Sequence, residues 1–215
     1  MISLFALILA LFMQPPPPVP DRAAAVDSTQ VYYATQNVEA LQKLLAASDD
    51  RTVQLLCRYR LYPLTEDDHY LHDLPTELAH PTARDLALLS GLWGYRVMTG
   101  SVLNVPQNGL RASKLMDEAK TLDPDEPFVL LIEGQSLLFR PAIFGGDKRA
   151  ALLRFQRLQT ILKEVSDNSI SEMEANLWVW YTLKKLKAEE APAMRSHLLA
   201  SDPPPLYRAF LLDPP

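Results

Sequence analysis

The chain has 215 residues, of which 48% are hydrophobic, and a formal net charge of −5. This length and apolar content indicate one globular domain with a sizeable core rather than a disordered chain. The negative charge, with no concentrated basic stretch, argues against a nucleic-acid binder, because contacts to phosphates need a basic surface. The single cysteine, Cys57, excludes an intramolecular disulfide and a cysteine-based zinc cluster, and its apolar helical context predicts a buried structural thiol.

The first residues differ in kind from the rest of the chain. Residues 2–13, ISLFALILALFM, form an unbroken apolar run with the length of a signal-peptide core, too short to cross a bilayer comfortably. A proline-rich stretch follows, and Ala23 to Ala25 offer the small residues that a signal peptidase requires. We therefore expect residues 1–25 to be an export signal and leader, which places the mature protein in the periplasm or cell envelope without a stable membrane span. The alternatives are a retained amino-terminal anchor and an incorrectly assigned start.

Beyond the leader, nearly every segment has the apolar spacing of an α-helix. In chain order the expected helices cover about 38–47, a segment after Asp50, 81–98, 110–122, 127–139, 147–165, 171–187, and a shorter segment that ends at 200. Asp147 and Ser171 have the residue types that cap helix starts. No run alternates apolar and polar residues as a strand would. The sequence predicts an all-α fold with a single domain at residues 26–205 and a short tail at 206–215.

A pattern of small and bulky residues recurs in two of the expected helix pairs, each time with a glycine in the preceding helix. Its members are Gly91 with Ala112, Met116 and Ala119, and Gly134 with Ala151, Phe155 and Leu158. The pattern resembles the second half of a tetratricopeptide repeat, in which such residues line the contact between paired helices. Pro124 closes the first unit as in that family, but both units exceed its repeat of about 34 residues and lack the tryptophan that the family has before the glycine.

This resemblance implies a short solenoid of stacked antiparallel helix pairs. Residues 169–203 look like a third, degenerate pair and residues 27–62 like a weak fourth, and three or more pairs suffice for a stable stack. The alternative is an irregular helical bundle in which the small residues only permit close packing.

The resemblance also implies a partner-binding groove. In tetratricopeptide-like folds the first helix of each pair lines the concave face, and residues one, four and five after each glycine would face it. Those residues are Leu92, Tyr95 and Arg96 in one unit, and Gln135, Leu138 and Phe139 in the next. An aromatic-rich groove with an arginine suits an extended peptide or a helix of another protein. The alternative is that these side chains pack against neighbouring helices.

Two stretches have residues that invite a chemical interpretation. His69 and His72 are three apart, so on a helix they could hold a metal together with a carboxylate; the simpler interpretation is an acidic connecting loop with solvated histidines. In FRPAIFGGDKRAALLRF, residues 139–155, Asp147 interrupts the glycine–lysine pair of a phosphate loop and Arg149 replaces its hydroxyl residue. We interpret the glycines as a turn and the lengthened connection as an edge of the binding surface. The sequence assigns no catalytic residue, metal ligand or cofactor.

The expected function is a non-enzymatic scaffold or adaptor of the cell envelope that binds a protein or peptide segment in a concave groove. One alternative is a periplasmic small-ligand-binding component of a transport system. A more remote alternative is a metal-dependent enzyme that uses the segment around His69 and His72. The sequence gives no indication of an oligomeric state.

Overall fold

The computed structural model describes residues 22–99, 105–165 and 168–215. Over these ranges the protein has ten α-helices and no strand, which confirms the predicted all-α fold. The helices are α2 (Arg22–Ala34), α3 (Val38–Ala47), α4 (Arg51–Thr65), α5 (Ala83–Thr99), α6 (Val105–Leu122), α7 (Pro127–Phe139), α8 (Lys148–Glu164), α9 (Glu172–Leu186), α10 (Ala191–Ala200) and α11 (Pro205–Leu212), with short 3₁₀ turns η1 (Asp68–Leu71) and η2 (Ala142–Phe144). The apolar run 2–13 and the proline-rich stretch after it lie outside the described residues.

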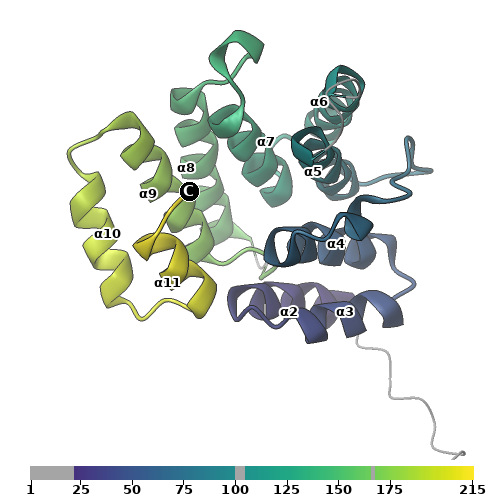
Figure 1. The fold of residues 1–215 in the computed structure, drawn as a ribbon, viewed down its shortest axis with the longest axis horizontal. Helices are drawn as coiled ribbons and strands as arrows, with labels where there is room; N and C mark the ends of the chain where they lie inside the picture. The colour runs from purple at the N-terminus through teal and green to yellow at the C-terminus, as the bar shows by residue number, and fades with distance from the viewer. Residues whose placement is uncertain (1–21, 100–104, 166–167) are drawn as a thin grey trace, which may run out of the picture.

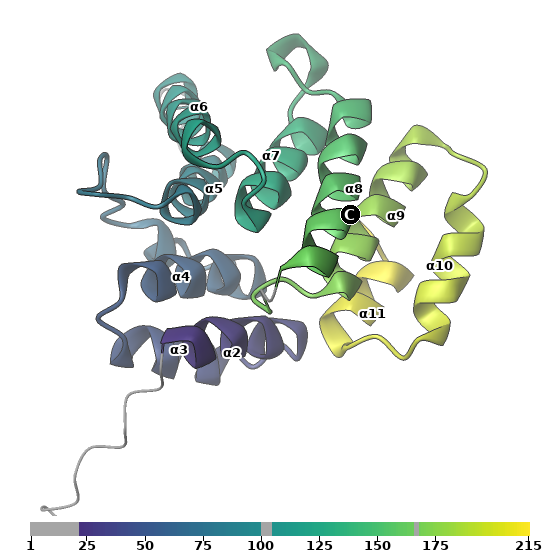
Figure 2. The same cartoon turned by 180° about the vertical axis from the view of Figure 1, so that it is seen from behind.

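The helices pack in neighbouring pairs (Figure 1). Helix α3 packs on α4, α5 on α6, α7 on α8, and α9 on α10, while contacts of α4 with α5, α5 with α7 and α8 with α9 join one pair to the next. Helix α2 covers α3 and α4 at one end, and α11 packs on α9 and α10 at the other. Helix α11 also reaches α2, so the two end helices lie side by side (Figure 1 and Figure 2). This arrangement is compatible with a tetratricopeptide-like fold.

Both ends of the expected domain differ from the structure. Residues 206–215, expected as a tail, supply most of α11, and Tyr207 and Leu211 are buried one helical turn apart. Pro205 occupies the first turn of this helix, where its fixed φ suits helix formation. At the other end α2 begins at Arg22, so the last residues assigned to the leader are helical and Ala25 is buried. The packed helices therefore extend from Arg22 to Leu212.

Helix ends are capped by short polar side chains. Asp50 Oδ1 accepts a hydrogen bond from the Val53 amide at 3.0 Å, and Asp147 Oδ1 accepts from the amides of Arg149 and Ala150. The Ser171 hydroxyl accepts from the Glu174 amide at 3.1 Å. Each contact satisfies a donor that the first turn of a helix leaves free.

Two of the helical glycines, Gly91 and Gly134, permit close approach of neighbouring helices. A Cβ added at Gly134 would lie 2.5 Å from the Phe155 ring, so α7 and α8 meet at this point. A Cβ at Gly91 would lie 2.8 Å from the Tyr59 ring of α4 and 3.2 Å from Ile132 of α7. Gly91 therefore admits two adjacent helices rather than its own partner, α6. The other residues of the pattern, Met116, Ala119, Ala151, Phe155 and Leu158, are buried, and Ala112 is partly buried.

Candidate functional site

A tyrosine cluster joins α4, α5 and α7. The Tyr95 ring of α5 lies 5.4 Å from that of Tyr59 and 4.8 Å from that of Tyr62, measured between centroids. Tyr59 donates its hydroxyl hydrogen to Gln135 Oε1 of α7 at 2.5 Å. Burial raises the pKa of both Tyr59 and Tyr95 well above the ordinary value. Tyr62, Tyr95 and Gln135 are only partly buried and so remain accessible at the surface.

A second aromatic cluster begins one helical turn further along α7. Phe139 is 49% exposed and lies edge-on to Trp178 of α9, with ring centroids 6.1 Å apart. Trp178 also meets Phe210 of α11 at 5.6 Å, and both are partly buried. Because Gln135 and Phe139 are four residues apart, they lie on the same side of α7 and connect the two clusters. We call the accessible set the aromatic face; it consists of Tyr62, Tyr95, Gln135, Phe139, Trp178 and Phe210.

Residues after α11 lie against one end of this face. The Tyr181 hydroxyl donates to the carbonyl oxygen of Pro215, and Lys185 Nζ donates to the same oxygen at 2.9 Å. The Tyr181 ring lies 5.0 Å from Phe210 and 6.1 Å from Phe139. Tyr181 is itself buried, so it supports the exposed rings from beneath.

The structure divides the six residues that the resemblance placed in a groove. Tyr95, Gln135 and Phe139 lie on the aromatic face. Leu92 and Leu138 are 0% and 6% exposed and belong to the core, because α5 and α7 each pack against neighbours on more than one side. Both leucines are thus removed from the accessible surface.

Arg96 also lies away from the aromatic face. Its guanidinium carbon is 5.1 Å from the centre of the Trp93 ring, which Arg111 of α6 approaches to 4.6 Å. Adjacent residues of a helix point roughly 100° apart, so Arg96 faces the α6 side while Tyr95 faces α4.

The groove prediction also omitted three residues of the face. Tyr62 follows Tyr59 by three residues, a spacing that places both on one side of α4. Phe210 lies in the segment expected to be a tail. Trp178 and Trp180 are two residues apart on α9, so they point to different sides; Trp180 is 2% exposed and Trp178 is the accessible one.

A buried ion pair lies at the centre of the fold. Arg60 Nη1 and Nη2 of α4 donate to the two carboxylate oxygens of Glu174 of α9 at 2.5 and 2.9 Å, and both side chains are 2% exposed. Arg60 Nη2 also donates to the Ser169 carbonyl, and the Tyr207 hydroxyl donates to Glu174 at 3.3 Å. The Arg60 guanidinium also lies 4.3 Å from the centre of the Tyr33 ring of α2. Burial, assisted by the charge of Glu174, raises the pKa of Tyr33 to about 12. These contacts connect α2, α4, α9 and α11.

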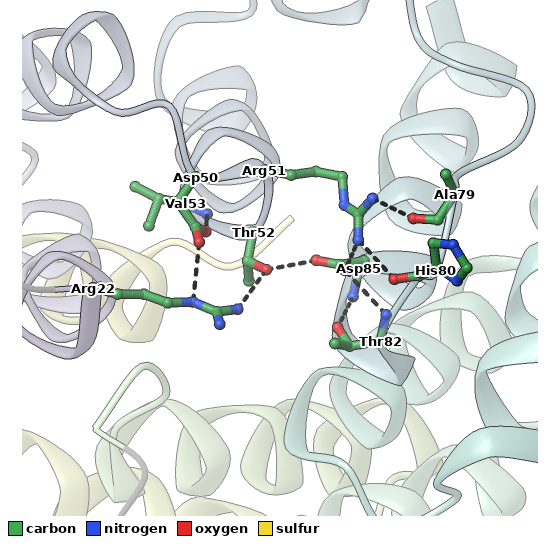
Figure 3. Close-up of polar contacts among 9 residues, drawn as sticks. All are labelled: Arg22, Asp50, Arg51, Thr52, Val53, Ala79, His80, Thr82 and Asp85. Atoms are coloured by element: carbon green, nitrogen blue, oxygen red, sulfur yellow. Dashed lines mark hydrogen bonds and ion pairs between the residues drawn. The ribbon is translucent and has the colours of Figure 1, made fainter.

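A second buried carboxylate, Asp85, joins the starts of α4 and α5 (Figure 3). Its Oδ1 accepts from the Thr52 hydroxyl at 2.6 Å, and its Oδ2 accepts from Arg51 Nη2 at 2.8 Å and from the Thr82 amide at 3.0 Å. The Thr82 hydroxyl accepts from the Asp85 amide, which completes a reciprocal capping box. Burial opposes ionisation of Asp85, but the hydrogen bonds from Thr52, Thr82 and Arg51 outweigh it and lower the pKa. Both oxygens of this carboxylate accept hydrogen bonds that stabilise the junction of α4 and α5.

The histidine segment forms the short turn η1. His69 Nδ1 lies 2.9 Å from Asp67 Oδ2, and His72 is exposed beyond the turn. Across the described ranges, no group of three or more His, Cys, Asp or Glu side chains is arranged to bind a metal. Cys57 is 0% exposed, and burial raises the pKa of its thiol to about 12.

Two hollows in the described surface have volumes of about 470 and 400 Å³, and both open widely to solvent. The first lies at the starts of α5 and α7, where Arg84 Nε donates to Glu126 Oε1 at 2.6 Å. The second lies between α9, α10 and the end of α11, beside Trp180 and Arg195. Neither adjoins the exposed ring of Phe139.

Comparisons with protein-family models, curated proteins and solved structures find no significant match. Of the described helices, none combines the length and apolar content that crossing a membrane requires. Function is therefore inferred from the geometry of the chain itself.

Proposed function

We propose that the protein is a non-enzymatic, tetratricopeptide-like scaffold or adaptor that binds a segment of a partner protein along the aromatic face. The observation that supports this proposal is the 49% exposure of Phe139 beside the partly buried rings of Trp178 and Phe210. Aromatic side chains bury large areas with few rotatable bonds, and they are enriched at protein interfaces. A helical frame that holds several of them at one surface is suited to binding.

The expected mechanism combines apolar contact with one directional polar group. Apolar side chains of the partner segment would pack on Phe139, Trp178 and Phe210, which together would form the centre of the interface. Gln135 already accepts a hydrogen bond from Tyr59 through Oε1, and its amide nitrogen has no hydrogen-bond partner within the described ranges. That nitrogen can donate to a backbone carbonyl of the partner and fix the register of the bound segment.

A pull-down from cell-envelope extract with matched variants tests this proposal. Phe139→Ser removes an exposed ring, so it should leave the fold intact and deplete the specific partner by tenfold or more, in the range of a central interface residue. Leu153→Ser changes a side chain of α8 that is 65% exposed, and it should leave the same partner bound. Equal recovery with both variants would show that the aromatic face is not the binding site.

The proposal also places the protein in the cell envelope as an exported protein, on the basis of the apolar run 2–13 and the alanines at 23–25. Mass spectrometry of the protein recovered from intact cells tests this part separately. A mature amino terminus close to residues 23–25 in the envelope fraction is the expected result. An intact Met1 in the soluble cytoplasmic fraction would contradict export without affecting the aromatic face.

A further inference from the structure

The connection between α7 and α8 projects beyond the ends of both helices (Figure 1 and Figure 2). It contains η2, on which Ile143 is 85% exposed and Phe144 is 69% exposed. Adjacent large apolar side chains with this degree of exposure are costly in water and often mark a surface that contacts another phase or molecule. We call residues 140–149 the tip.

The exposure of these two side chains is held in place by backbone hydrogen bonds. The amides of Phe144 and Gly146 both donate to the Pro141 carbonyl, at 2.9 and 3.1 Å, and the Asp147 amide donates to the Leu137 carbonyl at 2.9 Å. A Cβ at Gly146 would lie 1.8 Å from the Arg140 carbonyl oxygen, so only glycine permits this close return of the chain. The tip is thus a defined turn that presents Ile143 and Phe144 outward.

The tip is positively charged in a chain that is negative overall. Arg140, Lys148 and Arg149 are all exposed, and none forms an ion pair with any carboxylate in the described part of the chain. Asp147 is the one acidic residue of the tip, and its carboxylate caps α8. Three cations and one carboxylate give the tip a formal charge of +2, against −5 for the whole chain.

We propose that the tip is a peripheral membrane-contact site that inserts Ile143 and Phe144 into the surface of an anionic lipid bilayer, with Arg140, Lys148 and Arg149 among the headgroups. A projecting apolar pair flanked by cations matches a flat surface with an apolar interior and negatively charged headgroups. The inference concerns a different surface from the aromatic face and holds independently of the function proposed above.

An environment-sensitive dye attached to the full chain at Ile143→Cys tests the proposal. The natural cysteine, Cys57, is 0% exposed, so the dye couples at residue 143 alone. Vesicles of phosphatidylcholine with phosphatidylglycerol should shift the emission to the blue and increase it, and added salt should weaken the effect because it screens the headgroup charge. Vesicles of phosphatidylcholine alone should give little response.

The matched control carries the dye at Val31→Cys on α2, a position that is 53% exposed and far from the tip. It should not respond, even if residues 2–13 themselves hold the chain on the vesicles. Two further changes in the Ile143→Cys protein separate the contributions. Phe144→Ser should abolish the blue shift. Replacement of Arg140, Lys148 and Arg149 by Gln should weaken vesicle affinity about 100-fold, since each cation near an anionic surface contributes about fivefold.

Four results would overturn the proposal. The first is an unchanged emission at residue 143 with anionic vesicles to which the protein co-sediments. The second is an equal response with neutral vesicles, and the third is an equal response at residue 31. The fourth is a blue shift that appears with protein from cell-envelope extract but not with lipid vesicles. That result would assign the tip to a protein partner and exclude the lipid contact.

Discussion

Two of the buried carboxylates, Asp85 and Glu174, each bond to an arginine, but the two pairs stabilise different parts of the fold. Both bind an arginine, and they are 1% and 2% exposed. Arg51, the partner of Asp85, keeps 39% of its side chain exposed, whereas Arg60, the partner of Glu174, keeps 2%. Asp85 connects two consecutive helices, while Glu174 bonds to a residue 114 positions away. The first contact organises a local junction, and the second joins helices that lie far apart in the sequence.

The difference in arginine exposure determines how much stability each region should lose when its carboxylate is substituted. If Asp85 is lost, Arg51 can turn to water, and the helix start loses a few hydrogen bonds. If Glu174 is lost, Arg60 stays enclosed with its charge uncompensated, which is far more costly. Substitutions in the two regions therefore separate two losses of unfolding free energy. One comes from missing hydrogen bonds, and the other from a buried charge without a counter-charge.

Glu174→Leu should have the largest effect. We expect it to lower the free energy of unfolding by about 3–5 kcal/mol, because it leaves the Arg60 guanidinium buried without a counter-charge. Urea unfolding at neutral pH measures the change. The double variant Arg60→Met with Glu174→Leu should recover much of the loss, since a complete apolar replacement strands no charge. If the double variant were no more stable than the single one, the lost unfolding free energy would come from the missing ion pair and not from the unpaired arginine.

Asp85→Asn should cost less, about 2 kcal/mol, since it weakens charge-assisted hydrogen bonds but leaves Arg51 access to water. The same urea measurement applies. A loss as large as that for Glu174→Leu would mean that Arg51 cannot relax toward solvent, and the proposed distinction between the two regions would fail.

A smaller effect should appear when pH is lowered. The folded state lowers the pKa of Asp85, so its contribution is complete above the unfolded value of about 3.9 and disappears as pH falls through the folded pKa. The stability difference between the natural protein and Asp85→Asn should therefore be constant near neutrality and narrow below about pH 4. A difference that stays constant down to the acid transition would contradict the lowered pKa.

The smallest effect should come from a third carboxylate, which is exposed. Asp125 accepts two hydrogen bonds from Arg157, at 2.9 and 2.6 Å, but both side chains are almost half exposed. Asp125→Asn should change the urea midpoint little or not at all, because water screens such surface pairs. A clear loss of stability here would show that geometry, and not burial, governs the three carboxylates.

The local features of the fold could be predicted from the sequence. Apolar spacing identified most of the helices, and Asp50, Asp147 and Ser171 act as caps because the first turn of a helix leaves amides free within reach of a short polar side chain. The wide connection at Gly145 and Gly146 was likewise interpreted as a turn, and Gly145 has a φ of 90°. These features depend on neighbours within a few residues.

Features that depend on residues distant in the sequence could not be predicted from local sequence patterns. Leu92 and Tyr95 lie on one helix, and only the packing of α4, α6 and α7 around α5 decides which of them is enclosed. Phe210 belongs to the aromatic face because α11 folds back onto α9, which no local pattern indicates. The pairing of Arg60 with Glu174 likewise depends on how α4 and α9, 114 residues apart at this pair, are brought together by the whole fold.

The contact between α2 and α11 limits how this protein can evolve. Repeat arrays commonly change length by gaining or losing units, because each unit touches only its neighbours. Here the first and last described helices touch, and Gln30 of α2 donates to the Tyr207 hydroxyl at 3.5 Å. A helix pair inserted between α4 and α9 would separate α2 from α11 and draw Arg60 away from Glu174. Within the described residues, this contact therefore favours change by substitution at the surface over a change in the number of helix pairs.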